Sequence, residues 1–76
     1  MRLAAIYFPD WWEAAEKVGW YVGSMTVLNE KVVVSARRLE PVPARQPPHA
    51  KVTVARTDDA GVMIRAFQTL LRLEGA

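Results

Sequence analysis

Four of the five prolines in this chain of 76 residues lie between residues 41 and 48, and they limit where regular structure can form. Each proline removes a backbone N–H donor and restricts the residue before it to extended conformations. We therefore expect residues 40–50 to form an irregular, polyproline-like loop. The chain is long enough for only one core, so we expect residues 1–76 to form a single domain that contains this loop.

The first part of the chain predicts a strand followed by a short helix. The apolar run over residues 2–8 has the length of a buried strand and is bounded by Pro9. Asp10 is expected to cap a helix over residues 11–18, with Glu13 three residues later as its capping-box partner. A helix of two turns is unstable alone, so this one must pack against the rest of the domain.

A β-hairpin is expected next. Residues 20–28 and 31–39 are rich in aromatic and β-branched side chains, which favour extended backbone. Residues 29–30 between them predict a tight turn, because asparagine tolerates the positive φ that such turns use. Gly23 lies inside the first of these strands and indicates a bulge or a close backbone approach.

The C-terminal part predicts a third strand and a longer helix. Residues 51–56 alternate in polarity, residues 57–59 supply N-cap side chains, and residues 62–74 have helical periodicity. The resulting order is β-α-β-β-β-α. We therefore predict an α+β domain with a mainly antiparallel sheet of three or four strands and its helices on one face. The apolar stripe of the last helix consists of Met63, Ile64, Phe67, Leu70 and Leu71.

The residues needed for catalysis or metal binding are scarce. There is no cysteine, and His49 is the only histidine, which argues against nucleophilic catalysis and a structural zinc site. Glu13 and Glu16 share a helix face, but a solvated capping turn explains them, and Asp58–Asp59 is interpreted as a helix cap. We therefore expect no enzyme and no catalytic, cofactor or metal residues. A composite site around His49 at an oligomer interface is a remote alternative.

An aromatic cluster is the first candidate binding feature. Neighbours on a helix point about 100° apart, and neighbours on a strand point to opposite faces. One core cannot hold all of these rings equally, so they either fill a core short of volume or contribute to a protein interface. The interface candidates are Trp11, Trp12, Trp20 and Tyr21.

The second candidate feature is basic. Residues 31–56 carry six positive charges and one negative charge, a weak indication of an anionic partner such as nucleic acid. Arg37 and Arg38 are neighbours in a predicted strand, so only one of them can join a patch on either face. A scattered, solvated set of charges is the other interpretation. The candidates are Arg37, Arg38, Arg45, Lys51 and Arg56.

Two resemblances concern parts of the chain. Residues 3–16 (LAAIYFPDWWEAAE) look like the opening of Y-family polymerase-like proteins, with Asp10 matching one acidic position. Nothing downstream matches the remaining palm carboxylates, so polymerase activity is not implied. From Asp10 onward the predicted order is similar to that of double-stranded-RNA-binding domains. That family has lysines at the start of its last helix, where this chain has residues 57–60 (TDDA), so the resemblance implies a fold and not that mode of RNA binding.

The leading hypothesis from the sequence is a small non-enzymatic protein-binding module. It would be homo-oligomeric or bind a larger protein, as bacterial or phage inhibitors and adaptors do. The reason is the thin core: a chain of this length buries only about 60–65% of its unfolded surface, and here no disulfide or metal compensates. Nucleic-acid binding through residues 31–56 is the alternative. The lack of cysteine, signal peptide and apolar span leads us to expect a cytoplasmic protein with no membrane partner.

Overall fold

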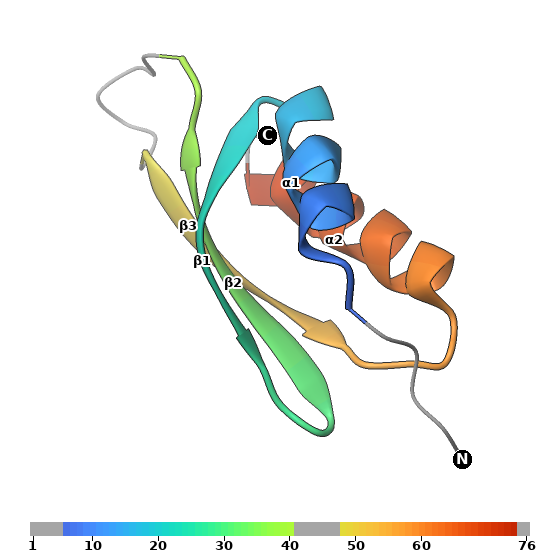
Figure 1. Cartoon of the computed structure of the whole chain (residues 1–76). Helices are drawn as coiled ribbons and strands as arrows, with labels where there is room; N and C mark the ends of the chain where they lie inside the picture. The colour runs from blue at the N-terminus through green and yellow to red at the C-terminus, as the bar shows by residue number, and fades with distance from the viewer. Residues whose placement is uncertain (1–5, 41–47, 75–76) are drawn as a thin grey trace.

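The computed structural model describes residues 6–40 and 48–74, which form two helices and one three-stranded sheet. The sheet is antiparallel with strand order β1-β2-β3, and both helices lie on one side of it, α1 against β1 and α2 against β3 (Figure 1). The α+β fold class and the antiparallel sheet are thus confirmed. The elements in chain order are α1 (Phe8–Lys17), β1 (Trp20–Val27), β2 (Lys31–Arg38), β3 (His49–Ala55) and α2 (Ala60–Glu74).

The predicted strand over residues 2–8 is wrong where the chain is described. Ile6 and Tyr7 have no regular structure and Phe8 already begins α1, while residues 2–5 lie outside the described residues. Pro9 occupies the first helical turn, where its missing N–H costs no hydrogen bond. Pro9 was expected to end a strand, and it lies instead in the first turn of a helix.

The predicted cap of α1 is wrong for the same reason. The N-cap position is Tyr7, and no side chain bonds to the helix start there. The backbone N–H of Asp10 donates to the Tyr7 carbonyl oxygen at 3.2 Å, so Asp10 lies inside the first turn. Its carboxylate can still stabilise the positive end of the helix.

The β1–β2 hairpin forms as predicted, but its turn does not use the positive φ that we expected of Asn29. The N–H of Leu28 donates to the carbonyl oxygen of Lys31 at 2.9 Å, which closes the turn around Asn29 and Glu30. Every described residue other than glycine has a negative φ, so Asn29 does not use the left-handed conformation that we expected of it.

The bulge predicted at Gly23 is present, and it determines which side chains of β1 face the helices. The register against β2 shifts between Val22 and Ser24. Before the bulge, Trp20 and Val22 face the helices; after it, Met25 pairs with Val34 on that same side. If Gly23 were paired in a regular ladder, strict alternation would turn Ser24 into the core instead.

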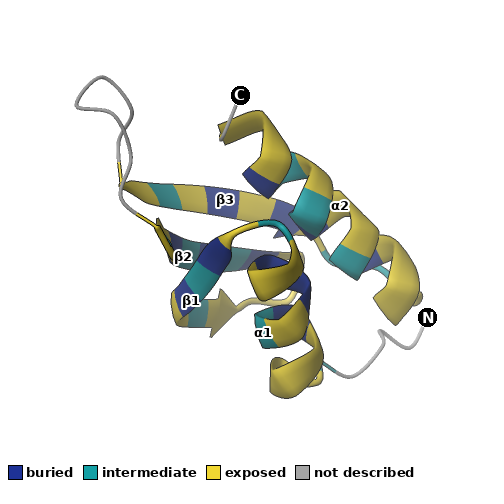
Figure 2. Cartoon of the chain, turned by 90° about the horizontal axis from the view of Figure 1, so that it is seen from above, coloured by how far each residue is buried: buried dark blue, intermediate teal, exposed yellow. Residues whose placement is uncertain are grey.

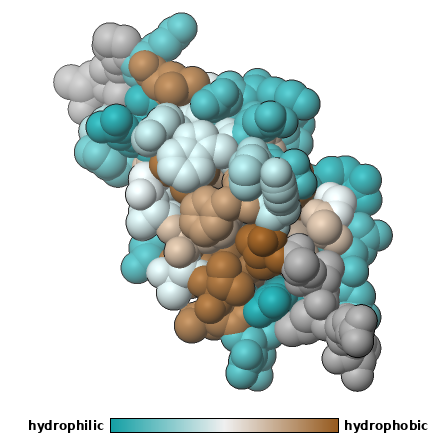
Figure 3. All heavy atoms as spheres, viewed as in Figure 1, coloured by the Kyte–Doolittle hydropathy of each residue, from teal (hydrophilic) through white to brown (hydrophobic). Residues whose placement is uncertain are grey.

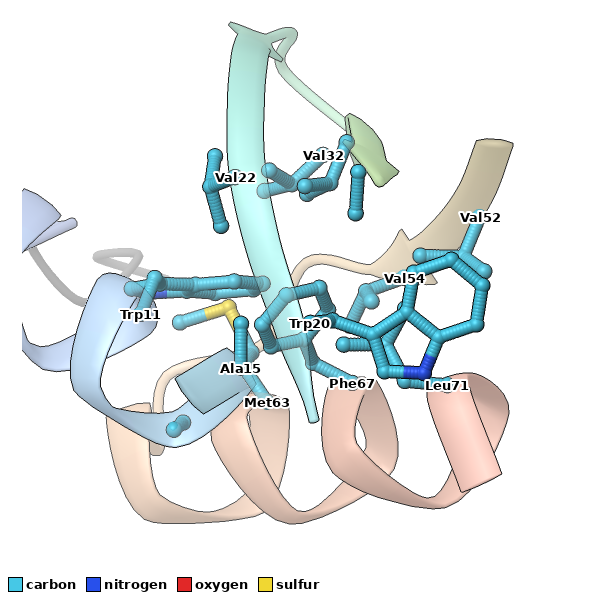
Figure 4. Close-up of a cluster of buried hydrophobic side chains, with 13 residues drawn as sticks. Trp11, Ala15, Trp20, Val22, Val32, Val52, Val54, Met63, Phe67 and Leu71 are labelled. Carbon is cyan, nitrogen blue, oxygen red and sulfur yellow. The ribbon is translucent and has the colours of Figure 1, made fainter. Parts of the chain in front are cut away.

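The core fills the space between the sheet and the two helices. It contains Trp11 of α1, Trp20 of β1 and Phe67 of α2, together with valines from all three strands (Figure 4). The rings of Trp11 and Phe67 lie 4.9 Å apart at an angle of 42°. Figure 2 shows the alternation of buried and exposed residues along β3 that follows from a sheet covered on one side only.

The start of α2 has the cap chemistry that the sequence predicts. A carboxylate oxygen of Asp59 accepts from the N–H of Val62 at 3.1 Å, and the hydroxyl of Thr57 accepts from the N–H of Asp59 at 3.2 Å. The predicted apolar stripe faces the core, with Met63, Phe67 and Leu71 fully buried and two further members half-buried. No helix in the described part of the chain is long and apolar enough to cross a membrane.

The predicted loop over residues 40–50 lies largely outside the described residues, which omit 41–47. Its last two residues belong to β3, which begins at His49 rather than at Lys51. The carbonyl oxygen of Pro48 accepts from the N–H of Arg38 at 2.9 Å, so pairing of β2 with β3 extends to the base of the loop.

Candidate binding surfaces

The four aromatic candidates separate into two buried and two partly exposed side chains. Trp11 and Trp20 are each only 1% exposed and belong to the core. Trp12 and Tyr21 are half-buried, and their rings meet edge to face with centroids 5.3 Å apart. Only Trp12 and Tyr21 of the four therefore offer surface to a partner in this conformation.

These two rings belong to a longer row of side chains, which we call the aromatic ladder: Phe8, Trp12, Tyr21 and Arg37. Phe8 lies one helical turn before Trp12, with ring centroids 6.1 Å apart, and is 41% exposed. The guanidinium carbon of Arg37 lies 5.1 Å from the centre of the Tyr21 ring. The ladder runs from α1 around the edge of the sheet at β1. Phe8 was missed as a candidate, although its i, i+4 spacing to Trp12 predicts this contact once a helix includes it.

β1 continues toward the hairpin turn beyond the N-terminal end of α1 (Figure 1), and several of its side chains there are apolar. Val27 and Leu28 are 40% and 44% exposed, and Met25 beside them is half-buried. Figure 3 shows brown, apolar residues gathered in the lower centre of this side of the molecule. No charged residue occurs between Lys17 and Glu30, so the whole of this edge strand is uncharged.

The sheet face opposite the helices, here called the outer face, is polar and basic. Arg37 and Lys51 lie on it together with Lys31, and no strand of the described sheet carries a carboxylate. The strands align its side chains in three rows, which are Tyr21–Arg37–His49, Ser24–Ser35–Lys51 and Thr26–Val33–Thr53.

The other basic candidates lie elsewhere. Arg38 points to the helix side, where its guanidinium carbon lies 4.7 Å from the centre of the Trp20 ring and one N–H donates to the carbonyl oxygen of Glu74 at 3.3 Å. Arg56 donates to the carbonyl oxygen of Leu28 at 3.0 Å and so holds the hairpin turn. Arg45 lies outside the described residues. The predicted separation of neighbouring Arg37 and Arg38 onto opposite faces is confirmed.

Arg38 and Arg56 each form a hydrogen bond, but each also buries a donor that has no partner in the described part of the chain. The Nε atoms of Arg38 and Arg56 are buried and have no hydrogen-bond partner among the described residues. An unpaired buried donor costs about 1–3 kcal/mol, which offsets part of what their terminal N–H groups gain. These two arginines therefore act in the fold, and the described basic candidates that are exposed to an anion are Arg37 and Lys51 of the outer face.

The described residues hold no group of three or more histidine, aspartate or glutamate side chains that could bind a metal ion, and they enclose no pocket. His49 is exposed at the start of β3, on the row with Arg37. Comparison of the chain with protein-family models, curated proteins and solved structures finds no match. The observed element order is α-β-β-β-α, and an order of elements alone does not establish a function.

Proposed function

We propose that this chain is a protein-binding module that associates with a second copy of itself through the edge of β1. The observation that carries the proposal is an edge strand of eight residues without charge or proline, flanked by exposed apolar side chains. Proteins usually protect such edges with lysine, proline or a covering element, because unpaired strand edges pair with other strands. The bulge at Gly23 is the only protective feature within β1 itself.

The absence of charge also favours a second copy as the partner. A two-fold interface brings the same strand of both copies together, so a charged strand would place like charges opposite each other. The edge of β1 has no charge to repel its copy. The other edge strand, β3, carries Lys51 and is less suited to pairing with itself.

The size of a stable interface requires more than the strand backbone. The chain exposes 5147 Å² in total, and an interface of standard size takes about 800 Å² from each partner, or about a sixth of that surface. We therefore expect Phe8 and Trp12 of the ladder, with Val27 and Leu28 near the turn, to be covered together with the edge. Aromatic residues of this kind are enriched among interface hot spots.

A lysine scan of the two sheet edges tests the proposal. Thr26 on β1 and Thr53 on β3 both pair with Val33 and are both exposed on the outer face, so they form a matched pair of sites. Thr26→Lys places a charge at the β1 edge and Thr53→Lys places the same charge at the β3 edge. Sedimentation velocity and light scattering over a wide concentration range would measure the mass of each variant.

We expect the unmodified chain and Thr53→Lys to form dimers as concentration rises, and Thr26→Lys to stay monomeric with unchanged circular dichroism. A chain that stays monomeric at every concentration would exclude self-association. Dimers that survive Thr26→Lys but not Thr53→Lys would place the interface at β3 and contradict the proposal.

A further inference from the structure

The outer face carries positive charges and no described negative charge. Lys31, Arg37 and Lys51 are all exposed there, and no described strand residue offers a carboxylate to balance them. Three of the four acidic residues in the first half of the chain, Asp10, Glu13 and Glu16, lie on α1, on the other side of the sheet. The fourth, Glu30, lies in the β1–β2 turn beside Lys31. One face of the molecule therefore presents three like charges over two neighbouring strands.

Arg37 occupies a defined position within this face. Its guanidinium group lies over the Tyr21 ring, and the edge of Trp12 supports that ring from the side of α1. The planar group is thereby held on the sheet surface while Arg37 itself stays exposed. A guanidinium plane supported in this way is a surface on which a nucleic-acid base can stack.

The polar side chains around Arg37 suit a phosphate backbone. Ser35 and Lys51 form the next row, and residues two apart along a strand are about 6.6–6.8 Å apart. Lysine and arginine neutralise phosphates, and serine and threonine hydroxyls donate hydrogen bonds to phosphate oxygens. The serine and threonine side chains of this face are Ser24, Thr26, Ser35 and Thr53.

We propose that the outer face binds single-stranded nucleic acid, with a base stacked on the Arg37–Tyr21 pair and the backbone held by Lys31, Arg37 and Lys51. A duplex fits less well, because its bases are already stacked and the three-stranded face has no helix to enter a groove. Both helices lie on the far side of the sheet (Figure 1). This site adjoins the β1 edge through Tyr21 and Trp12 of the aromatic ladder, but it does not depend on self-association.

Fluorescence anisotropy with a labelled oligothymidylate of about ten nucleotides tests the site at about 50 mM salt. Three neutralised phosphates on a single strand predict a slope of about −2 for log K against log salt concentration. The double variant Arg37→Gln with Lys51→Gln should make the slope less steep, about −0.7, and should weaken binding at least about tenfold. The matched control is Arg65→Gln with Arg72→Gln, which removes the same charge from exposed positions on α2.

The conservative variant Arg37→Lys separates stacking from charge. It retains the positive charge but has no planar group to lie on Tyr21, so affinity should fall while the salt slope stays the same. If the α2 control variant binds as weakly as the outer-face double variant, binding depends only on total charge and not on a defined site. That result would overturn the proposal.

Three further results would also refute it: no binding at low salt, equal affinity for a duplex of the same length, or displacement by polyglutamate at the same concentration as by oligothymidylate. Each measurement uses labelled probe with protein below the concentration at which dimers form. Failure of the self-association proposal would therefore leave this result unaffected.

Discussion

Arg37 and Arg38 are adjacent in β2 and chemically identical, so replacing each with alanine isolates the effect of the face that it occupies. Arg38 is half-buried over Trp20 and donates to the last turn of α2. Arg37 is exposed over the half-buried ring of Tyr21. We expect Arg38→Ala to reduce the free energy of unfolding more than Arg37→Ala.

The expected magnitudes follow from these contacts. A partly desolvated cation–π contact is worth about 1–2 kcal/mol, and a cation at a helix C-terminus about 0.3–1 kcal/mol. Relief of the unpaired Nε of Arg38 returns about 1 kcal/mol, so Arg38→Ala should cost about 0.3–2 kcal/mol in total. Arg37→Ala loses only an exposed cation–π contact, about 0.5–1 kcal/mol.

Urea unfolding, followed by tryptophan fluorescence and by far-ultraviolet circular dichroism, measures both values. The upper ends of the two ranges differ by about 1 kcal/mol, which corresponds to about 4–8 °C in Tm for a domain of this size. Arg38→Met is a useful companion variant, because it retains apolar packing on Trp20 while it removes the charge and the hydrogen bond to Glu74. Equal losses for Arg37→Ala and Arg38→Ala would refute the assignment of the two arginines to different roles.

Two further predictions concern the ends of the helices. Gly19 has φ +86° and open space where a Cβ would lie, so Gly19→Ala should cost about 1 kcal/mol from backbone conformation alone, and Gly19→Asn less. A urea midpoint for Gly19→Ala equal to that of the unmodified chain would contradict this. Asp59→Ala should cost about 1 kcal/mol by removing the acceptor for Val62, whereas Asp59→Asn keeps an oxygen there and should lose much less. Thermal melts that place both Asp59 variants together would argue against the cap.

The strands and α2 could be predicted because their patterns are unambiguous. Thirteen residues of helical periodicity follow a cap at residues 57–59, and paired strands follow from the β-branched runs. The bulge at Gly23 was also predictable, since a glycine inside a strand is usually there for a backbone reason. Each of these signals is local and depends little on the rest of the fold.

The N-terminal strand could not be distinguished from a helix start by local reasoning. Pro9 is compatible with the end of a strand and with the first turn of a helix, and the apolar run before it is too short to decide. Its assignment depends on where α1 docks. Trp11 is followed by Ala14 and Ala15 at helical spacing, and these small residues let the helix approach the sheet with Trp11 inward.

The candidate surfaces required the register of the sheet. The sequence placed Arg37 and Arg38 on opposite faces but did not assign the faces. The alternation of Val32, Val34 and Ala36, which are the buried residues of β2, places Arg38 on the core side. The row Tyr21–Arg37–His49 joins three strands, and its members are up to 28 residues apart in sequence. Pairings of that range cannot be read from local pattern.

The Gly23 bulge has a consequence for a saturation mutagenesis experiment. Tolerance to substitution should alternate with period two along β2, with sensitive positions at Val32, Val34 and Ala36. In β1 the same rhythm should hold through Val22 and then shift phase by one residue, so that Met25 is the next sensitive position. Deletion of Gly23 should leave Met25 facing the core, because Val22 and Ser24 already pair with the adjacent residues Ala36 and Ser35 of β2. The sensitive positions of β1 would then alternate strictly along the whole strand, as they do in β2.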